Sequence, residues 1–98
     1  MAVPSCAGAY VSGAAGSNEC PAGSARIEAE AACRTAAAAA GKRVPSDFAE
    51  TVAYYPRGCY YWTSSVYFNT HAVGAGFSTL RLLCAALATT SGALLMRR

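Results

Sequence analysis

The chain has 98 residues, of which 13% are charged, and its formal net charge is +3 at pH 7. A single domain of this length buries a modest hydrophobic core and has little stability to spare, so we expect covalent support. The few charges are scattered along the sequence, which excludes the dense basic surface that nucleic-acid binding requires.

Five cysteines stand at positions 6, 20, 33, 59 and 84, and the chain contains one histidine and no Cys-x-x-Cys pair. This spacing favours disulfide bonds over free thiols and over a metal site, so we expect no metal. Five cysteines cannot all pair, and we expect Cys6 to be free or bonded to another chain. Disulfides imply an oxidising compartment, whereas the first residues lack the pattern of a secretory signal peptide. We therefore expect a targeting peptide that this sequence does not contain, with reduced cysteines as the alternative.

Residues 1–19 are small and polar and have no hydrophobic period, which predicts an irregular leader lying over a partner or over its own domain. After a turn comes the strongest helix pattern, Ala25–Ala40, with Ser24 as the N-cap and Gly41 as the residue that ends it. One face of this helix carries small side chains and one cysteine: Ala29, Cys33, Ala36, Ala37 and Ala40. Cys33 is therefore expected to reach a strand packed beneath the helix.

The segment 55–71 concentrates aromatic residues and predicts a β-hairpin, with strands Gly58–Trp62 and Val66–Asn69 joined by Thr63–Ser65. Side chains alternate along a strand, so the hairpin has two faces. We expect one face to pack in the core, and it carries Cys59, Tyr61, Val66 and Phe68. The opposite face carries the residues expected to contact a partner or a ligand: Tyr60, Trp62, Tyr67 and Asn69.

The last part of the chain, Phe77–Arg98, is apolar and predicts a C-terminal helix, with no charge between Leu82 and Met96. The uncharged stretch would extend about 22 Å as a helix, less than the roughly 30 Å hydrocarbon core of a membrane. We expect a peripheral helix packed on a partner, with a single marginal membrane span as the alternative. Its packing residues would be Leu82, Leu83, Leu87, Leu94 and Leu95.

These elements together predict an α+β fold, in which one alanine-rich helix packs on a short antiparallel sheet of two or three strands. Two disulfides hold this domain together over residues 20–84. The irregular leader 1–19 precedes it, and the apolar tail 85–98 follows as a helix.

Five short strings of the sequence form a recognisable pattern: Cys20-Pro-Ala-Gly-Ser-Ala-Arg-Ile27, Ala31-Ala-Cys33, Tyr55-Pro-Arg-Gly-Cys59, Val66-Tyr-Phe-Asn-Thr70 and Leu83-Cys84. This pattern resembles a small cysteine-rich domain of uncharacterised dinoflagellate and related algal proteins. The resemblance covers residues 20–84 and leaves out Cys6 and the apolar run after Cys84. It implies a disulfide-stapled module and an algal source, and it carries no activity.

Four of the five cysteines belong to this shared pattern. We expect Cys33 of the helix to pair with Cys59 of the hairpin, and Cys20 to pair with Cys84 and join the two ends of the domain. Each crosslink would stabilise the fold by roughly 2–4 kcal/mol by restricting the unfolded chain.

The histidine and the acidic side chains of the sequence give little indication of a catalytic site. His71, beside a glycine-bearing loop, is an ordinary loop histidine by default, with a nucleophilic Cys–His pair and an axial ligand to a pigment metal as the alternatives. Glu28 and Glu30 are two residues apart on the predicted helix, so they do not face each other as an acid/base pair. We expect no enzyme and no cofactor of the chain's own, with a pigment contact at His71 as the one candidate.

The sequence therefore favours an accessory subunit of a larger membrane-associated assembly that uses the hairpin aromatics as interface anchors. The algal resemblance makes a photosystem of the thylakoid the natural candidate for that assembly, with the stapled domain on the lumenal side. The alternative is an extracellular or cell-surface module that stacks the same aromatic rings on glycans.

Overall fold

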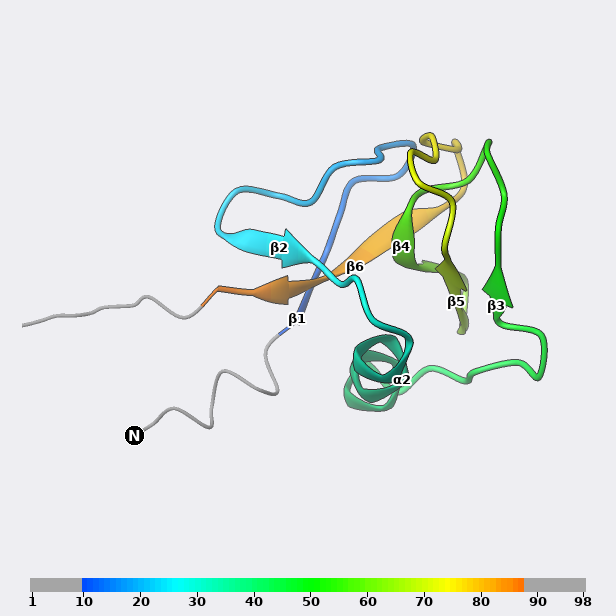
Figure 1. The fold of residues 1–98 in the computed structure, drawn as a ribbon. Helices are drawn as coiled ribbons and strands as arrows, with labels where there is room; N and C mark the ends of the chain where they lie inside the picture. The colour runs from blue at the N-terminus through cyan, green and yellow to red at the C-terminus, as the bar shows by residue number, and fades with distance from the viewer. Residues whose placement is uncertain (1–9, 88–98) are drawn as a thin grey trace, which may run out of the picture.

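The computed structural model describes residues 10–87, which form a six-stranded mixed sheet and one short helix (Figure 1). The elements are β1 (Tyr10–Ser12), β2 (Ser24–Arg26), α2 (Glu30–Ala39), β3 (Ala49–Glu50), β4 (Gly58–Trp62), β5 (Ser65–Asn69) and β6 (Arg81–Ala86). The strand order is β1-β6-β4-β5-β3, and β2 also pairs with β6. The predicted fold, a small sheet of two or three strands followed by an apolar C-terminal helix, is therefore wrong.

The largest correction concerns β6, which lies where the sequence predicted the start of an apolar helix. Tyr10 and Ala25 both pair with Ala85, while Tyr60 of β4 pairs with Leu82. β6 thus has neighbours along both edges, and Leu82, Leu83 and Cys84 are all buried. A strand buried on both faces has a continuous apolar sequence, which periodicity cannot distinguish from a buried helix.

The remainder of the predicted tail, including Leu94 and Leu95, lies outside the described residues, as does Cys6. Within residues 10–87, no helix has the length and apolar character needed to cross a membrane. Leu82 and Leu83, expected to pack on a partner, instead pack inside the domain.

The alanine-rich helix is shorter than predicted, because its expected first turn is strand β2. Ser24 is not the N-cap: its hydroxyl donates to the Pro21 carbonyl, and the helix begins after Ala29 with no side-chain cap. Backbone pairing of residues 24–26 with β6 outweighs the good helix preference of Ala25 and Arg26. At the other end Gly41 has a φ of 71°, a conformation that suits glycine and follows the last helical turn as predicted.

The hairpin prediction is confirmed with a shift of one residue, since β5 begins at Ser65. Cys59 lies opposite Phe68 and Tyr61 opposite Val66, while Tyr60 lies opposite Tyr67. The two predicted sets of side chains therefore do lie on opposite faces. The set Cys59, Tyr61, Val66 and Phe68 is called here the helix face, and the set Tyr60, Trp62, Tyr67 and Asn69 the pocket face.

Each face of the sheet has its own core and its own disulfide. On the helix face, α2 and Phe48 cover the hairpin, and Cys33–Cys59 joins α2 to β4. On the pocket face, Tyr60, Leu80, Leu82 and Cys84 form a smaller cluster, and Cys20–Cys84 joins the loop before β2 to β6. Both disulfides are the expected pairings.

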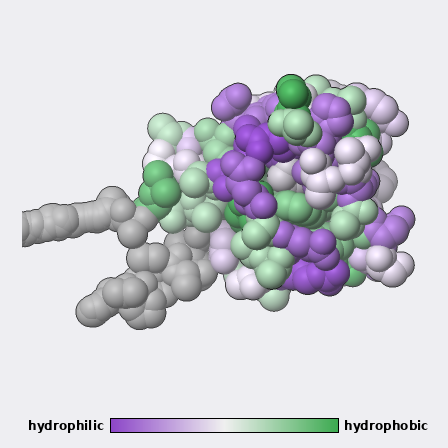
Figure 2. Space-filling view, in the orientation of Figure 1, coloured by the Kyte–Doolittle hydropathy of each residue, from purple (hydrophilic) through white to green (hydrophobic). Residues whose placement is uncertain are grey.

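Strand β1 lies within the segment expected to be an irregular leader. It pairs with β6, and the backbone N–H groups of Gly13 and Gly16 continue the contact by donating to Leu82 and Leu80. The two ends of the described chain therefore lie side by side (Figure 1). In the same view, hydrophilic and hydrophobic residues intermingle over the surface without one broad apolar expanse (Figure 2).

Candidate functional site

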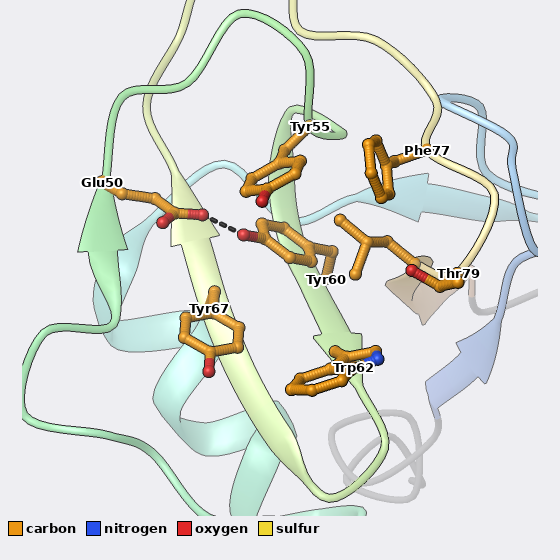
Figure 3. A pocket seen from close by; sticks show the side chains of 8 residues that line it. Glu50, Tyr55, Tyr60, Trp62, Tyr67, Phe77 and Thr79 are labelled. Carbon is orange, nitrogen blue, oxygen red and sulfur yellow. Dashed lines mark hydrogen bonds between the residues drawn. The ribbon is translucent and has the colours of Figure 1, made fainter.

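The pocket face of the hairpin opens into a hollow of about 490 Å³, called here the aromatic pocket (Figure 3). Its lining residues are Glu50, Tyr55, Tyr60, Trp62, Tyr67, Phe77, Thr79 and Leu80. The volume lies within the range of roughly 300–1,000 Å³ that is usual for ligand sites in proteins. Five of the eight lining side chains are aromatic, so the pocket offers ring faces and ring edges as its main contact surface.

Strand alternation and strand pairing build the floor of this pocket. Tyr60 and Trp62 are two residues apart on β4 and therefore point to the same side, while Tyr67 of β5 lies directly opposite Tyr60. The Tyr60 and Tyr67 rings are stacked with centroids 5.5 Å apart. Trp62 stands at the end of β4 and remains 52% exposed.

Two loops supply the wall of the pocket. Tyr55 precedes β4, and its ring centroid lies 5.8 Å from that of Tyr60. Phe77, from the loop before β6, meets the Tyr55 ring edge-to-face at 5.2 Å. The rings of Tyr67, Tyr60, Tyr55 and Phe77 thus form a continuous row of aromatic contacts, as Figure 3 shows.

A carboxylate lies at one side of this row, where the Tyr60 hydroxyl donates a hydrogen bond to Oε2 of Glu50 (Figure 3). Burial of the Tyr60 side chain, followed by this hydrogen bond to Glu50, raises the pKa of the Tyr60 hydroxyl well above its ordinary value. Tyr60 therefore remains a neutral donor over the physiological range, and its hydroxyl holds the Glu50 carboxylate in place.

Asn69, predicted to face a partner or ligand, is used within the fold. It is 1% exposed, and its Nδ2 donates to the carbonyls of Val52, Tyr55 and Pro56. Its Oδ1 accepts from the backbone N–H groups of Val52 and His71. Asn69 thereby holds the loop that carries Tyr55, so it shapes the aromatic pocket without lining it.

His71 lies at a second, smaller hollow of about 190 Å³, beside the ion pair between Glu28 and Arg57. Its Nδ1 accepts backbone N–H bonds from Val73 and Gly74, at 3.1 and 2.9 Å. The ring therefore closes its own loop, as a turn-forming side chain does. Across residues 10–87, no group of three His, Cys, Asp or Glu side chains is arranged to hold a metal ion.

The structure brings together three of the predicted contact residues, Tyr60, Trp62 and Tyr67, and adds lining residues that sequence reasoning missed. For Tyr55 the sequence offered a weak indication of a loop position beside the hairpin, since the Tyr54–Tyr55 pair precedes a proline. Glu50 had none, because its place depends on the parallel pairing of β3 with β5. Phe77 was assigned to the predicted C-terminal helix.

Comparison with other proteins adds no precedent for this site. No protein-family model, curated protein or solved structure matches the chain.

Proposed function

We propose that this chain is a non-enzymatic, disulfide-stapled binding domain that acts as an accessory subunit of a larger protein assembly, with the aromatic pocket as its contact site. The observation that carries this proposal is the half-exposed Trp62 beside an open row of aromatic rings. Tryptophan and tyrosine side chains in such positions often supply most of the binding energy of a protein interface.

Exposed apolar side chains continue around the pocket. Phe77 lines it at 41% exposure, and Tyr54 packs edge-to-face on Tyr55 at 4.9 Å while being 63% exposed. A partner covering this surface would remove several large apolar groups from water, each contributing up to roughly 1.5–3 kcal/mol when fully buried.

Support for binding over catalysis comes from how the fold uses its reactive groups. The four described cysteines are all in disulfides, which removes their thiols as nucleophiles. The His71 Nδ1 is occupied by two backbone donors, and the Tyr60 hydroxyl is donated to Glu50. These groups hold local structure in place, and the aromatic pocket offers contact area.

The specific setting that we propose is a membrane-associated algal photosynthetic assembly, a photosystem, with the domain on the lumenal side of the thylakoid. Its support is the resemblance of residues 20–84 to the algal cysteine-rich domain, together with the two disulfides, which suit an oxidising compartment. Under this proposal the exposed aromatic side chains are the points of attachment to other subunits.

A second candidate is a glycan-binding module, extracellular or on a cell surface. The observation that favours it is the combination of the exposed Trp62 ring with polar groups of Glu50 and Thr79 in one open hollow. Aromatic faces can stack on sugar rings while polar groups bond to hydroxyls. A change in Trp62 fluorescence on adding oligosaccharides would favour this candidate over a protein contact.

Copurification under non-denaturing conditions tests the leading proposal. The tagged chain should retain a defined set of proteins, and Trp62→Ala should reduce that retention at least tenfold, because an interface anchor of this type contributes about 2 kcal/mol or more. Val11→Ala is the matched control, since Val11 is also an exposed apolar side chain but lies on β1 outside the pocket. Retention unchanged by Trp62→Ala would reject the proposal.

A further inference from the structure

We propose that the aromatic pocket receives a basic side chain, the guanidinium or ammonium group of an arginine or lysine presented by a protein partner. The inference rests on the proposed function, and it assigns the chemistry of the partner at the same site. Three features carry it: the charge of the pocket, its partly exposed aromatic rings and the arrangement of Glu50.

The pocket is acidic although the chain is basic. Glu50 is the one ionisable acid or base among the lining residues other than tyrosines, whereas the chain as a whole has a net charge of +3. A positively charged ligand is therefore attracted locally at a place where the protein surface would otherwise repel it. An anionic or a purely apolar ligand gains nothing from this carboxylate.

The two faces of the sheet differ in whether cationic side chains of the chain itself cover their aromatic rings. On the helix side, the Arg34 guanidinium lies 4.3 Å from the Phe48 ring centroid, and the Lys42 ammonium lies 4.2 Å from that of Tyr61. Among residues 10–87, no lysine or arginine covers a ring of the pocket in this way. Tyr60 is buried and stacks on Tyr67, so the ring surface left for a cation from outside the chain belongs to the exposed Trp62 and Phe77 and to the partly exposed Tyr55 and Tyr67.

Glu50 is arranged as a counter-charge. Its Oε2 accepts from the Tyr60 hydroxyl, and within the described part of the chain no hydrogen bond or ion pair engages Oε1. The carboxylate is thus held beside the row of rings with one oxygen free to accept from a charged donor (Figure 3). A carboxylate beside several aromatic rings is a common arrangement for binding organic cations.

The size of the pocket favours a long side chain over a small ion. A volume of about 490 Å³ exceeds what an ammonium or guanidinium group fills by itself. The methylene stem of an arginine or lysine can lie against Phe77 and Leu80 while its head reaches the rings and Glu50. The open side of the pocket then accommodates the chain of the partner.

Trp62 provides a built-in reporter, because it is the one tryptophan of the chain and lines the pocket. The probes are blocked tripeptides of the form Gly-X-Gly, with arginine or lysine at X, and neutral isosteres with citrulline or norleucine. On the full chain at low salt, Trp62 fluorescence should report binding of the arginine or lysine peptide at least fivefold tighter than its isostere. Raising the salt concentration should reduce that preference, because it is electrostatic.

Glu50→Gln removes the charge but keeps an acceptor for Tyr60, and it should abolish most of the preference for the basic peptide. Glu30→Gln is the matched control, since Glu30 is an exposed acid on α2 that takes no part in the pocket. A near-ultraviolet circular dichroism spectrum identical to that of the unchanged chain establishes that each variant is folded. The isostere and salt comparisons need no variant, so they test the proposal even if Glu50→Gln misfolds.

Equal binding of the basic peptides and their isosteres, no binding of either, or a preference that survives Glu50→Gln would each overturn the inference. Copurification separates this failure from failure of the proposed function. If Glu50→Gln retains the partner proteins while Trp62→Ala loses them, the interface stands and the basic ligand is wrong. If Trp62→Ala also retains them, the proposed function itself is wrong. A fluorescence response to oligosaccharides in place of basic peptides would assign the pocket to glycans.

Discussion

The two faces of the β4–β5 hairpin are built from alternating residues of the same ten positions, and they are completed in opposite ways. On the helix face, α2 lies close to the hairpin because the buried side chains between them, Ala36 and Ala37, are small. The Cys33–Cys59 disulfide fixes the helix in this position. On the pocket face, Cys20–Cys84 joins the loop before β2 to β6, and the aromatic rings of β4 and β5 remain beside an open hollow. The first face is closed and the second is not.

This difference indicates that the helix face contributes to stability alone, whereas the pocket face combines buried residues that stabilise the fold with exposed residues available for binding. A hairpin alternates its side chains with a period of two, so substitutions on one face need not disturb the other. The helix face should therefore respond to mutation through the free energy of unfolding, and the exposed part of the pocket face through binding. Four predictions test this division, in order of decreasing effect on stability.

The largest effect is expected for the disulfide beneath the helix. Replacing Cys33 and Cys59 together with alanine should lower the free energy of unfolding by about 4 kcal/mol, because the crosslink closes a long loop and lies in the core. Urea unfolding followed by circular dichroism measures the loss. A loss below about 1 kcal/mol would contradict the assignment of stability to this face.

The other disulfide sharpens the same comparison. Cys20–Cys84 has a sequence separation of 64 against 26 for Cys33–Cys59, so chain entropy alone favours a loss about 0.8 kcal/mol larger for the matching double-alanine variant. Cys33 and Cys59 are both fully buried, whereas Cys20 is partly exposed. The loss of buried contacts therefore favours a larger loss of stability for the Cys33/Cys59 variant. We expect the two losses to agree within about 1 kcal/mol.

The second prediction concerns Asn69, the buried member of the pocket face. Asn69→Ala leaves several buried backbone groups without their partners and should lower the free energy of unfolding by about 3 kcal/mol. It should also loosen the loop carrying Tyr55 and weaken ligand binding at Trp62. Thr51→Ala, which removes an exposed side-chain hydrogen bond nearby, is the control and should change stability by less than about 1 kcal/mol. A stable Asn69→Ala variant would show that the loop has other support.

The third prediction is a pH dependence from Tyr60. The folded state holds its proton above the ordinary tyrosine pKa of about 10, so the unfolded chain releases a proton that the folded chain keeps. The stabilisation from Tyr60 is therefore complete below pH 10 and is lost as the pH rises above it, by up to about 1.4 kcal/mol per pH unit. Tyr60→Phe lacks this loss, so its stability should fall less steeply between pH 9 and pH 11.

Urea unfolding at several pH values checks this slope, with any free thiol blocked beforehand to prevent disulfide exchange at alkaline pH. At neutral pH, Tyr60→Phe should cost about 1 kcal/mol, because Glu50 loses its hydrogen-bond donor. Parallel curves for the two proteins above pH 10 would contradict the account of Tyr60 as a proton held by burial.

Sequence reasoning predicted the parts of the molecule that depend on local pattern. The hairpin and the division of its faces follow from alternation at Cys59, Tyr60, Val66 and Tyr67, and Gly41 ends the helix because of its backbone freedom. The disulfide pairings were also expected, since Cys33 faces the hairpin from the helix and Cys20 and Cys84 lie at the two ends of the domain.

The errors arose where distant pairing decides the local structure. Ala25 and Arg26 have good helix preference but form β2 because β6 offers them backbone partners. Leu82, Leu83 and Cys84 were assigned to a helix because a strand buried on both faces lacks the alternation of apolar and polar residues that identifies a strand. Glu50 lines the pocket because β3 pairs in parallel with β5, and no local sequence pattern predicts this pairing.

The fourth prediction, with the smallest effect on stability, tests the division between the two faces most directly. Trp62→Ala removes a half-exposed side chain from the pocket face, so it should change the free energy of unfolding by less than about 0.5 kcal/mol. The same variant should lose at least tenfold in retention of partner proteins, as an interface anchor does.

Measuring both quantities on one preparation of Trp62→Ala is the decisive experiment, with Val11→Ala carried alongside. The account predicts unchanged urea unfolding together with lost copurification for Trp62→Ala, and no change in either for Val11→Ala. Unfolding at distinctly lower urea, or full retention of the partners, would contradict the claim that the exposed part of the pocket face serves binding and contributes little to stability.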